Sequence, residues 1–355
     1  MNQRAYKKSR AKYDSTSESN TKSLSNNSGR KIFPPHKKSS DLFDLVGNTP
    51  LVDLKMFREE FPKSRVSAKL EYLNPGGSLK DRPVARIIRA ALAEGKLTSE
   101  KTLLDSSSGN AGISYSLFGA ALGVKVHLVA PGNASSERLE RIRAHGASLT
   151  LTDPMEGYDE AIRTAHRIYE ENPNKYFLAD QYGNENNWRA HYETTGVEIS
   201  LQAPEITHFV GGVGTGGSIT GISRRLKTVR SDITIVCVRP ERFPGIEGLK
   251  PLGEPDDIKP AIFDESSVDE WIPISAETAR EYSHKLAREG FFVGHSSGAY
   301  LAAVKEILKD EPRAQIVTLL NDTGERYMSV GLWDGLSGWG RQSDGNTNED
   351  SRNKN

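Results

Sequence analysis

The 355-residue chain has only one cysteine, Cys237, which excludes an intrachain disulfide and any metal site built from several cysteines. This scarcity is typical of a reducing compartment, and we expect a cytoplasmic location. No apolar run approaches the ~20 residues that cross a bilayer, and the polar N-terminus lacks the hydrophobic stretch of a secretory signal. The sequence therefore predicts no membrane partner.

Net charge is also absent, since 47 Lys+Arg balance 47 Asp+Glu, but the charges are unevenly distributed. Residues 1–40 hold ten basic and two acidic residues and almost no large apolar side chains, which predicts a disordered basic tail. A transit peptide and a weak anion-binding arm are the alternatives for this tail. Residues 336–355 are similarly polar, and we predict a second disordered tail there.

Two further classes of site find no support in the sequence. The eight histidines show no metal-ligand spacing, so we expect no metal. Outside the tail, basic residues alternate with acidic residues along predicted helices, so we expect no nucleic-acid partner.

Short apolar runs alternate with amphipathic stretches between the two tails. This alternation predicts an α/β fold with mostly parallel, doubly wound sheets, and the length fits two such domains. We predict strands over residues 66–73, 101–106, 125–131, 147–153, 175–180, 206–212, 234–240 and 316–322. We predict helices over residues 86–95, 114–123, 137–146, 158–171, 218–229 and 298–309. Functional groups should gather at the carboxyl ends of the strands.

Lys80 lies in the segment NPGGSLKDRP, between a glycine pair and a predicted helix. Asp81 is the predicted N-cap, and Pro83 suits the first helical turn. A helix N-terminus disfavours an ammonium, so the free amine of Lys80 is favoured and can act as a base or form a Schiff base. A solvated surface lysine is the alternative interpretation.

Two loops that follow strands are suited to binding anions. The loop DSSSGNAGIS, residues 105–114, leaves backbone amides uncovered at a helix N-terminus, although ordinary turns share its composition. The loop GGVGTGGSITG, residues 211–221, has glycines in G-x-G-x-x-G spacing, which lets a phosphate approach the backbone. A nicotinamide-dependent enzyme is the alternative, but the next strand ends in Arg239 where that class expects an acidic residue.

Two other loops give weaker signals. Residues 294–298, GHSSG, match the nucleophile motif of serine hydrolases, but that family needs a histidine after the serine and His295 is the last histidine in the chain. We therefore interpret Ser296 and Ser297 as helix caps. Residues 322–324 follow the last predicted strand, where an ordinary turn is the alternative.

The segments NPGGSLKDR, SSSGNAG, GVGTGGSITG and TGERYMS occur in the order found in the cysteine synthase and cystathionine β-synthase family. The segment LVGNTPLVDL is similar to the opening of that family, and the resemblance covers roughly residues 42–334. It implies two doubly wound, three-layer αβα domains of fold type II and pyridoxal 5′-phosphate as the cofactor. It also implies a large cofactor-binding domain (residues 41–73 and 184–335), a small mobile domain (residues 74–183) that closes over the substrate, and a homodimer.

The resemblance also assigns roles to residues of this chain. Lys80 would bind the cofactor covalently, Asn110 would hydrogen-bond its ring hydroxyl, and Thr323 would face its pyridine nitrogen. The cofactor phosphate would be bound by Gly214, Thr215, Gly216, Gly217 and Ser218. The carboxylate of an amino-acid substrate would be held by Ser107, Ser108, Ala111 and Gln181.

The implied reaction is β-replacement on an O-activated L-serine, either O-acetylserine or O-phosphoserine, with sulfide as the nucleophile and L-cysteine as the product. Ala111 stands where the family usually has a threonine, so the identity of the amino-acid substrate stays undecided. Arg242 could attract a phosphorylated leaving group, and an ordinary exposed arginine is the alternative interpretation. The alternatives within the family are cystathionine synthesis, S-sulfocysteine synthesis and serine or threonine dehydration. From other classes, an NAD(P)-dependent oxidoreductase and a catalytically silent binding protein stay open.

Overall fold

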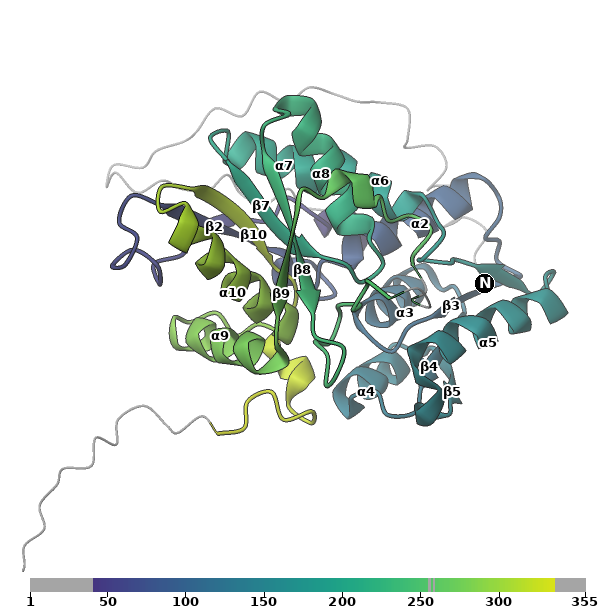
Figure 1. Ribbon diagram of the computed structural model, residues 1–355. Helices are drawn as coiled ribbons and strands as arrows, with labels where there is room; N and C mark the ends of the chain where they lie inside the picture. The colour runs from purple at the N-terminus through teal and green to yellow at the C-terminus, as the bar shows by residue number, and fades with distance from the viewer. Residues whose placement is uncertain (1–40, 255–256, 258, 336–355) are drawn as a thin grey trace, which may run out of the picture.

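Two β-sheets organise the chain, whose computed structural model describes residues 41–254, 257 and 259–335 (Figure 1). The larger sheet has six strands in the order β1-β2-β10-β7-β8-β9, and the smaller has four in the order β5-β4-β3-β6. All neighbouring strands are parallel except β1 and β2. The strands are β1 (Leu51–Asp53), β2 (Arg65–Leu70), β3 (Thr102–Ser106), β4 (Val126–Pro131), β5 (Ser148–Thr152), β6 (Tyr176–Leu178), β7 (His208–Gly212), β8 (Thr234–Pro240), β9 (Glu270–Ile274) and β10 (Gln315–Leu320).

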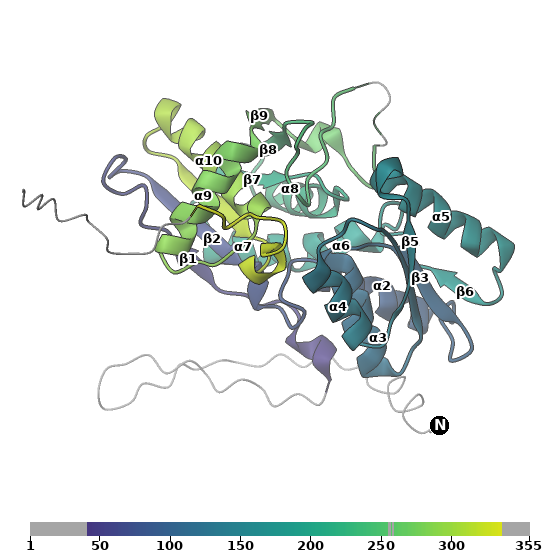
Figure 2. The ribbon, with the colours of Figure 1, turned by 90° about the horizontal axis from the view of Figure 1, so that it is seen from below.

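Helices separate most of these strands, and Figure 2 shows the two sheet units beside one another. The α-helices are α2 (Asp81–Ala93), α3 (Asn110–Leu122), α4 (Ser136–Ala144), α5 (Gly157–Glu171), α6 (Asn186–Glu193), α7 (Thr195–Gln202), α8 (Gly217–Val229), α9 (Ala276–Arg288) and α10 (His295–Asp310). Short 3₁₀ helices are η1 (Leu42–Leu45), η2 (Glu71–Leu73), η3 (Pro154–Glu156), η4 (Glu265–Ser267) and η5 (Gly324–Tyr327). The predicted α/β class with two doubly wound units is confirmed.

Separate apolar cores stabilise the two sheets. One cluster fills the six-stranded unit and includes Cys237, which is fully buried in β8. The four-stranded sheet has a cluster on each face, one beneath α2, α3 and α4 and one beneath α5. Phe43 packs on Phe118 of α3, so the first residues of the segment 41–73 contact the small unit. Burial of such clusters supplies the main driving force for folding.

All eight predicted strands and all six predicted helices are present, but two further strands and three further α-helices were not predicted. β1 has only three residues, and β9 has an exposed and half-buried sequence with little periodicity. The helices α6 and α7 have eight residues each, which is short for a periodicity argument. The start of α9 could have been predicted, because serine is a preferred N-cap residue. Ser275 caps this helix by accepting a hydrogen bond from the backbone N–H of Thr278 at 3.1 Å.

The predictions for residues 1–40 and 336–355 lie outside the described residues. Among those that are described, no helix combines the length and the apolar character needed to cross a membrane.

Candidate functional site

Lys80 is the N-cap residue of α2, and the helix itself begins at Asp81. The prediction that Asp81 caps the helix is wrong. Its carboxylate turns away from the helix amides and accepts hydrogen bonds from the backbone N–H of Gly76, at 2.5 Å, and from the hydroxyl of Ser114. Burial raises the pKa of Asp81 to about 6. Asp81 thus joins the glycine pair before Lys80 to helix α3.

The free amine of Lys80 is favoured in the structure, as the sequence predicted, but burial is the main cause. Loss of hydration disfavours the ammonium and lowers the pKa of Lys80 to about 8, while the charge of Asp322 partly opposes this shift. A lysine with this pKa is a substantial fraction neutral near pH 7 to 8. It can therefore act as a nucleophile or a base.

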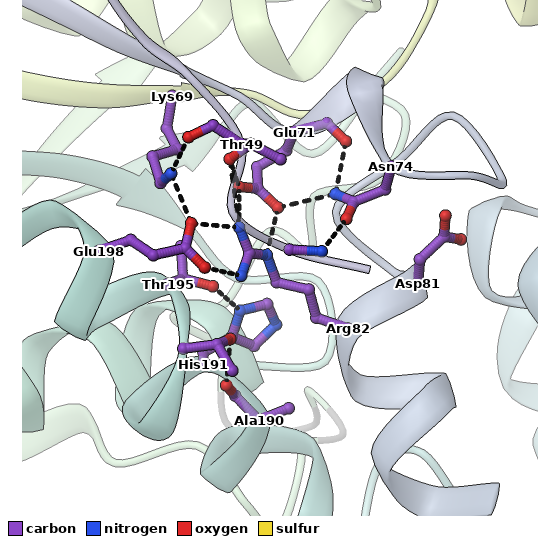
Figure 3. A network of polar contacts seen from close by, with 12 residues as sticks. Thr49, Lys69, Glu71, Asn74, Asp81, Arg82, Ala190, His191, Thr195 and Glu198 are labelled. Atoms are coloured by element: carbon purple, nitrogen blue, oxygen red, sulfur yellow. Dashed lines mark hydrogen bonds and ion pairs between the residues drawn. The ribbon is translucent and has the colours of Figure 1, made fainter. Parts of the chain in front are cut away.

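A buried ionic network around Arg82 holds the start of α2 in place (Figure 3). Arg82 donates through Nε to Glu71 Oε2 at 2.7 Å and through Nη1 to Glu198 Oε1 at 2.6 Å. Lys69 Nζ lies 2.5 Å from Glu198 Oε2 and donates to the carbonyl of Thr49. Two cations and two anions share a nearly dry site, so each charge is matched. The network fixes Arg82, two residues after Lys80.

The loop after β3 presents the predicted substrate-binding residues at the N-terminus of α3. Ser107 is buried, and its Oγ accepts hydrogen bonds from the backbone N–H groups of Gly109, at 3.2 Å, and Gly112, at 2.9 Å. Ser108 is partly exposed, and Ala111 is buried in the first turn of α3. The first amides of a helix have no intrahelical partner, so this loop can bind a carboxylate.

Gln181 and Asn187 connect the substrate loop to the glycine loop. Gln181 is buried and donates through Nε2 to the carbonyl of Ser106 at 2.7 Å. Asn187 donates through Nδ2 to the carbonyl of Gln181 at 2.7 Å and to Thr215 Oγ1 at 3.1 Å. One chain of hydrogen bonds therefore places the end of β3 beside the loop that follows β7.

The glycine loop between β7 and α8 fits a phosphate group. Gly216 has φ of 82°, in the left-handed region, and is the N-cap of α8. A Cβ on Gly217 would lie 2.0 Å from Asn187 Oδ1, and one on Gly214 would lie 2.6 Å from the carbonyl of Gly248. Glycine is thus required at three positions, and Ser218 in the first helical turn adds a hydroxyl beside the free amides.

Asn110, the first residue of α3, lies between two residues that follow β10. Its Nδ2 donates to Asp322 Oδ2 at 2.7 Å, and its Oδ1 accepts a hydrogen bond from Arg326. Arg326 also donates to the carbonyl of Gly76, four residues before Lys80. The loops that carry Lys80 and Asn110 and the segment after β10 therefore converge on one point. Sequence reasoning assigned no role to Arg326 and interpreted Asp322 only as part of a turn.

Two hydroxyl residues lie near the end of β10: Thr323 follows this strand, and Ser296 is in the first turn of α10. Thr323 is partly buried, pairs with Val293 in an isolated antiparallel bridge, and lies close to Gly77, whose added Cβ would be 3.7 Å from Thr323 Cγ2. Ser296 is buried, and its Oγ accepts from Asn321 Nδ2 at 3.0 Å, which leaves its own hydrogen to donate. Thr323 stays the predicted partner of the pyridine nitrogen, and Ser296 is a second hydroxyl that sequence reasoning did not consider for that role.

The interpretation of Ser296 and Ser297 as helix caps is wrong. The N-cap of α10 is Gly294, and no side chain caps this helix. Ser297 Oγ instead accepts a hydrogen bond from the backbone N–H of Asn321 at 3.0 Å. Both serines therefore join α10 to the end of β10 rather than closing the helix.

Arg242 is exposed, and Asp257 occupies its guanidinium through two hydrogen bonds at 2.9 and 3.1 Å. An arginine already paired in this bidentate way has little left to offer a phosphorylated leaving group. The interpretation as an exposed loop arginine is favoured.

Comparison with known proteins agrees with this arrangement. The model of the family described as "Pyridoxal-phosphate dependent enzyme" matches residues 42–322. The cysteine synthase of Aquifex aeolicus is 44% identical over 314 residues, which cover 86% of this chain and 95% of that protein. Among solved structures, O-ureido-L-serine synthase has a TM-score of 0.79 at 34% identity and covers 85% of this chain and 97% of its own. A cysteine synthase from Entamoeba histolytica has a TM-score of 0.78 at 34% identity, covering 86% of this chain and 93% of its own.

Proposed function

Because the chain belongs to the family of pyridoxal-phosphate-dependent enzymes, we propose that it is a cysteine synthase, which replaces the acetoxy group of O-acetyl-L-serine by sulfide. The family and the cofactor agree with the sequence prediction. The observation that carries the proposal is the desolvated amine of Lys80 at the point where three loops converge. The occupied guanidinium of Arg242 favours O-acetylserine over O-phosphoserine as the donor.

The residues present fit this cofactor. The loop from Gly214 to Ser218 would hold its phosphate, and Lys80 would bind its aldehyde carbon through Nζ. When bound, the cofactor supplies an electron sink for the charge that develops at the substrate Cα. A neutral hydroxyl, from Thr323 or Ser296, draws less charge into the ring than a carboxylate would, which favours loss of the Cβ substituent over transamination.

Lys80 would have a second role as a base when its amine is free. Its free amine takes the proton from the substrate Cα, and a pKa of about 8 lets the amine accept that proton near neutral pH. The backbone amides of Ser108, Asn110 and Ala111, together with the hydroxyls of Ser107 and Ser108 and the amide of Gln181, would bind the substrate carboxylate. These contacts orient the Cα–H bond toward Lys80.

Helices α4 and α5 of the small unit face the loop after β8. Closure of residues 74–183 over the substrate would exclude water from the reacting Cβ. The sheet membership of the strands supports the proposed boundaries, because all four strands of the small sheet lie between residues 102 and 178. A homodimer and a cytoplasmic location, which we also propose, are tested by analytical ultracentrifugation and by imaging of a tagged chain.

Replacing Lys80 with alanine should abolish turnover, since this removes both the covalent anchor and the base. The wild-type protein loaded with pyridoxal phosphate should absorb in the near-violet, and borohydride should bleach this band. K80A should lack the bleachable band while it keeps the far-ultraviolet circular dichroism of the wild type. Near-native cysteine formation by K80A would refute the assignment.

A panel of donors and nucleophiles distinguishes the alternatives within the family. O-acetylserine, O-phosphoserine, serine and threonine are each supplied with sulfide, thiosulfate or homocysteine, and the products are identified by mass. The proposal requires cysteine from O-acetylserine and sulfide to be the fastest reaction. Cystathionine, S-sulfocysteine or an oxo acid as the dominant product would assign another reaction to the same site, and no product with any pair would favour a silent protein.

A further inference from the structure

The carboxamide of Asn110 contacts a charged group at each end. Nδ2 donates to Asp322 Oδ2 at 2.7 Å, and Oδ1 accepts from Arg326 Nη1. A carboxylate can only accept a hydrogen bond, and a guanidinium can only donate one. The flipped amide would set an N–H group against the guanidinium and a carbonyl against the carboxylate, so the two neighbours allow a single orientation of Asn110.

Asp322 is itself held firmly. It is fully buried, and its Oδ2 also accepts a hydrogen bond from the Tyr327 hydroxyl at 2.7 Å. Its backbone pairs with Ser78 in an isolated antiparallel bridge, while Leu79 donates to the carbonyl of Asn321 at 2.8 Å. The carboxylate that orients Asn110 is therefore fixed to the segment that leads directly into Lys80.

Arg326 is buried and held from the opposite side. Besides Asn110, it donates through Nη2 to the carbonyl of Gly76. A side chain at Gly77 would clash with this guanidinium, because its Cβ would lie 2.6 Å from Nη2. The glycine pair before Lys80 thus leaves room for the arginine that fixes the other end of the Asn110 amide.

The Asn110 amide nitrogen carries two hydrogens, and Asp322 Oδ2 takes one of them. We propose that Asp322 and Arg326 form a positioning pair that keeps Asn110 turned so that its second N–H donates to the ring oxygen of the cofactor. This donor stabilises that oxygen in its anionic form. The inference rests on the proposed cofactor site and adds to it two residues that act through Asn110.

The test uses D322N, N110A and the double variant D322N/N110A, each as the full chain loaded with pyridoxal phosphate. The readouts are the ratio of near-violet to near-ultraviolet cofactor absorbance and the dissociation constant of the cofactor, followed by fluorescence. In D322N the neighbour can offer either an oxygen or an N–H, so one of the two constraints on the Asn110 amide is lost and only Arg326 still opposes the flipped orientation. The dissociation constant should rise about tenfold and the absorbance ratio should fall, as expected for loss of a hydrogen bond to a charged group.

The double variant decides whether Asp322 acts through Asn110. Once Asn110 is removed, D322N should cause no further change in either readout. Effects that multiply in the double variant, or a D322N spectrum equal to that of the wild type, would overturn the proposal. The control is D232N, the same chemical change at an exposed aspartate that pairs with Arg230, and it should match the wild type.

If D322N fails to fold, R326K makes the same test from the other end of the Asn110 amide. In the N110A background, adding R326K should change neither the absorbance ratio nor the dissociation constant of the cofactor. A multiplicative effect there would equally refute the positioning role. Failure of the proposed function gives a different result, because N110A alone would then leave cofactor binding unchanged.

Discussion

Among the polar contacts that join residues 74–183 to the rest of the described chain, two groups differ in burial. The inner junction consists of Lys69, Glu71, Arg82 and Glu198, with side-chain exposures between 0% and 13%. The outer junction consists of Lys250 with Asp159, Arg138 with Glu247, and Glu137 with Ser329. Each outer contact joins α4 or the start of α5 to the loop after β8 or the segment after η5. The acidic partners Asp159 and Glu247 are 36% and 39% exposed, whereas the side chains of Lys250 and Arg138 are 18% and 4% exposed, so each outer pair has one partner in contact with water.

The difference in burial gives the two junctions different roles. Separating the inner junction would leave bare charges in a dry site, which costs several kcal/mol for each ion. Exposed ion pairs are each worth about 0 to 1 kcal/mol, because water replaces the partner when the pair separates. We therefore expect the side next to Lys80 to stay fixed, and the proposed closure over the substrate to take place at α4 and α5.

Breaking the inner junction should have the largest effect. Glu198→Gln removes the carboxylate shared by Arg82 and Lys69 and leaves two cations with only Glu71. We expect the free energy of unfolding to fall by about 3 kcal/mol at pH 7, measured by urea titration.

The matched control is Glu193→Gln, which breaks an exposed pair with Arg86. Its effect should stay within about 0.5 kcal/mol. Equal losses in the two variants would show that burial does not distinguish the inner junction from a surface pair.

Acid should weaken the inner junction over a defined range of pH. Burial opposes ionisation of Glu198, but hydrogen bonds and charge from Arg82 and Lys69 outweigh it and lower its pKa to about 2. Its stabilising contribution is complete above the unfolded pKa of about 4.3 and is lost as the pH falls from there toward 2. The difference in unfolding free energy between the wild type and E198Q should therefore shrink across this range. A difference that stays constant from pH 7 to pH 3 would contradict the assigned pairing.

Breaking the outer junction should have the smallest effect on stability and a measurable effect on substrate binding. In Lys250→Met the unfolding free energy should change by less than about 1 kcal/mol. The KM for O-acetylserine should rise by about threefold, which corresponds to about 0.6 kcal/mol, because the closed form loses one contact. High salt should reduce the difference from the wild type, since partly exposed pairs are screened.

Lys227→Met is the matched control, because Lys227 pairs with Asp269 inside the large unit at 2.7 Å. Its KM should equal that of the wild type. If both lysine variants raise KM equally, the outer junction has no special part in closure. If Lys250→Met loses as much stability as E198Q, the two junctions do not differ in the way their burial suggests.

Much of the site could be predicted because its signals are local. Lys80 follows a glycine pair at a helix start, and the glycine spacing of residues 212–217 constrains the backbone wherever the loop lies. Asp322 and Arg326 gave no such signal, because a charged residue in a turn usually faces water. Only the packing of η5 against the loop before Lys80 buries them and directs them to Asn110.

By itself, the sequence determined the α/β class and eight of the strands, and it predicted the anion-binding loops and the reactive lysine, because these depend on periodicity and on residues adjacent in the chain. The tertiary structure decided which charges are buried, which side chains contact Asn110 and how exposed each junction is. These properties depend on how much water remains around a group, and hydration is set by segments that lie more than a hundred residues apart, as Arg82 and Glu198 do.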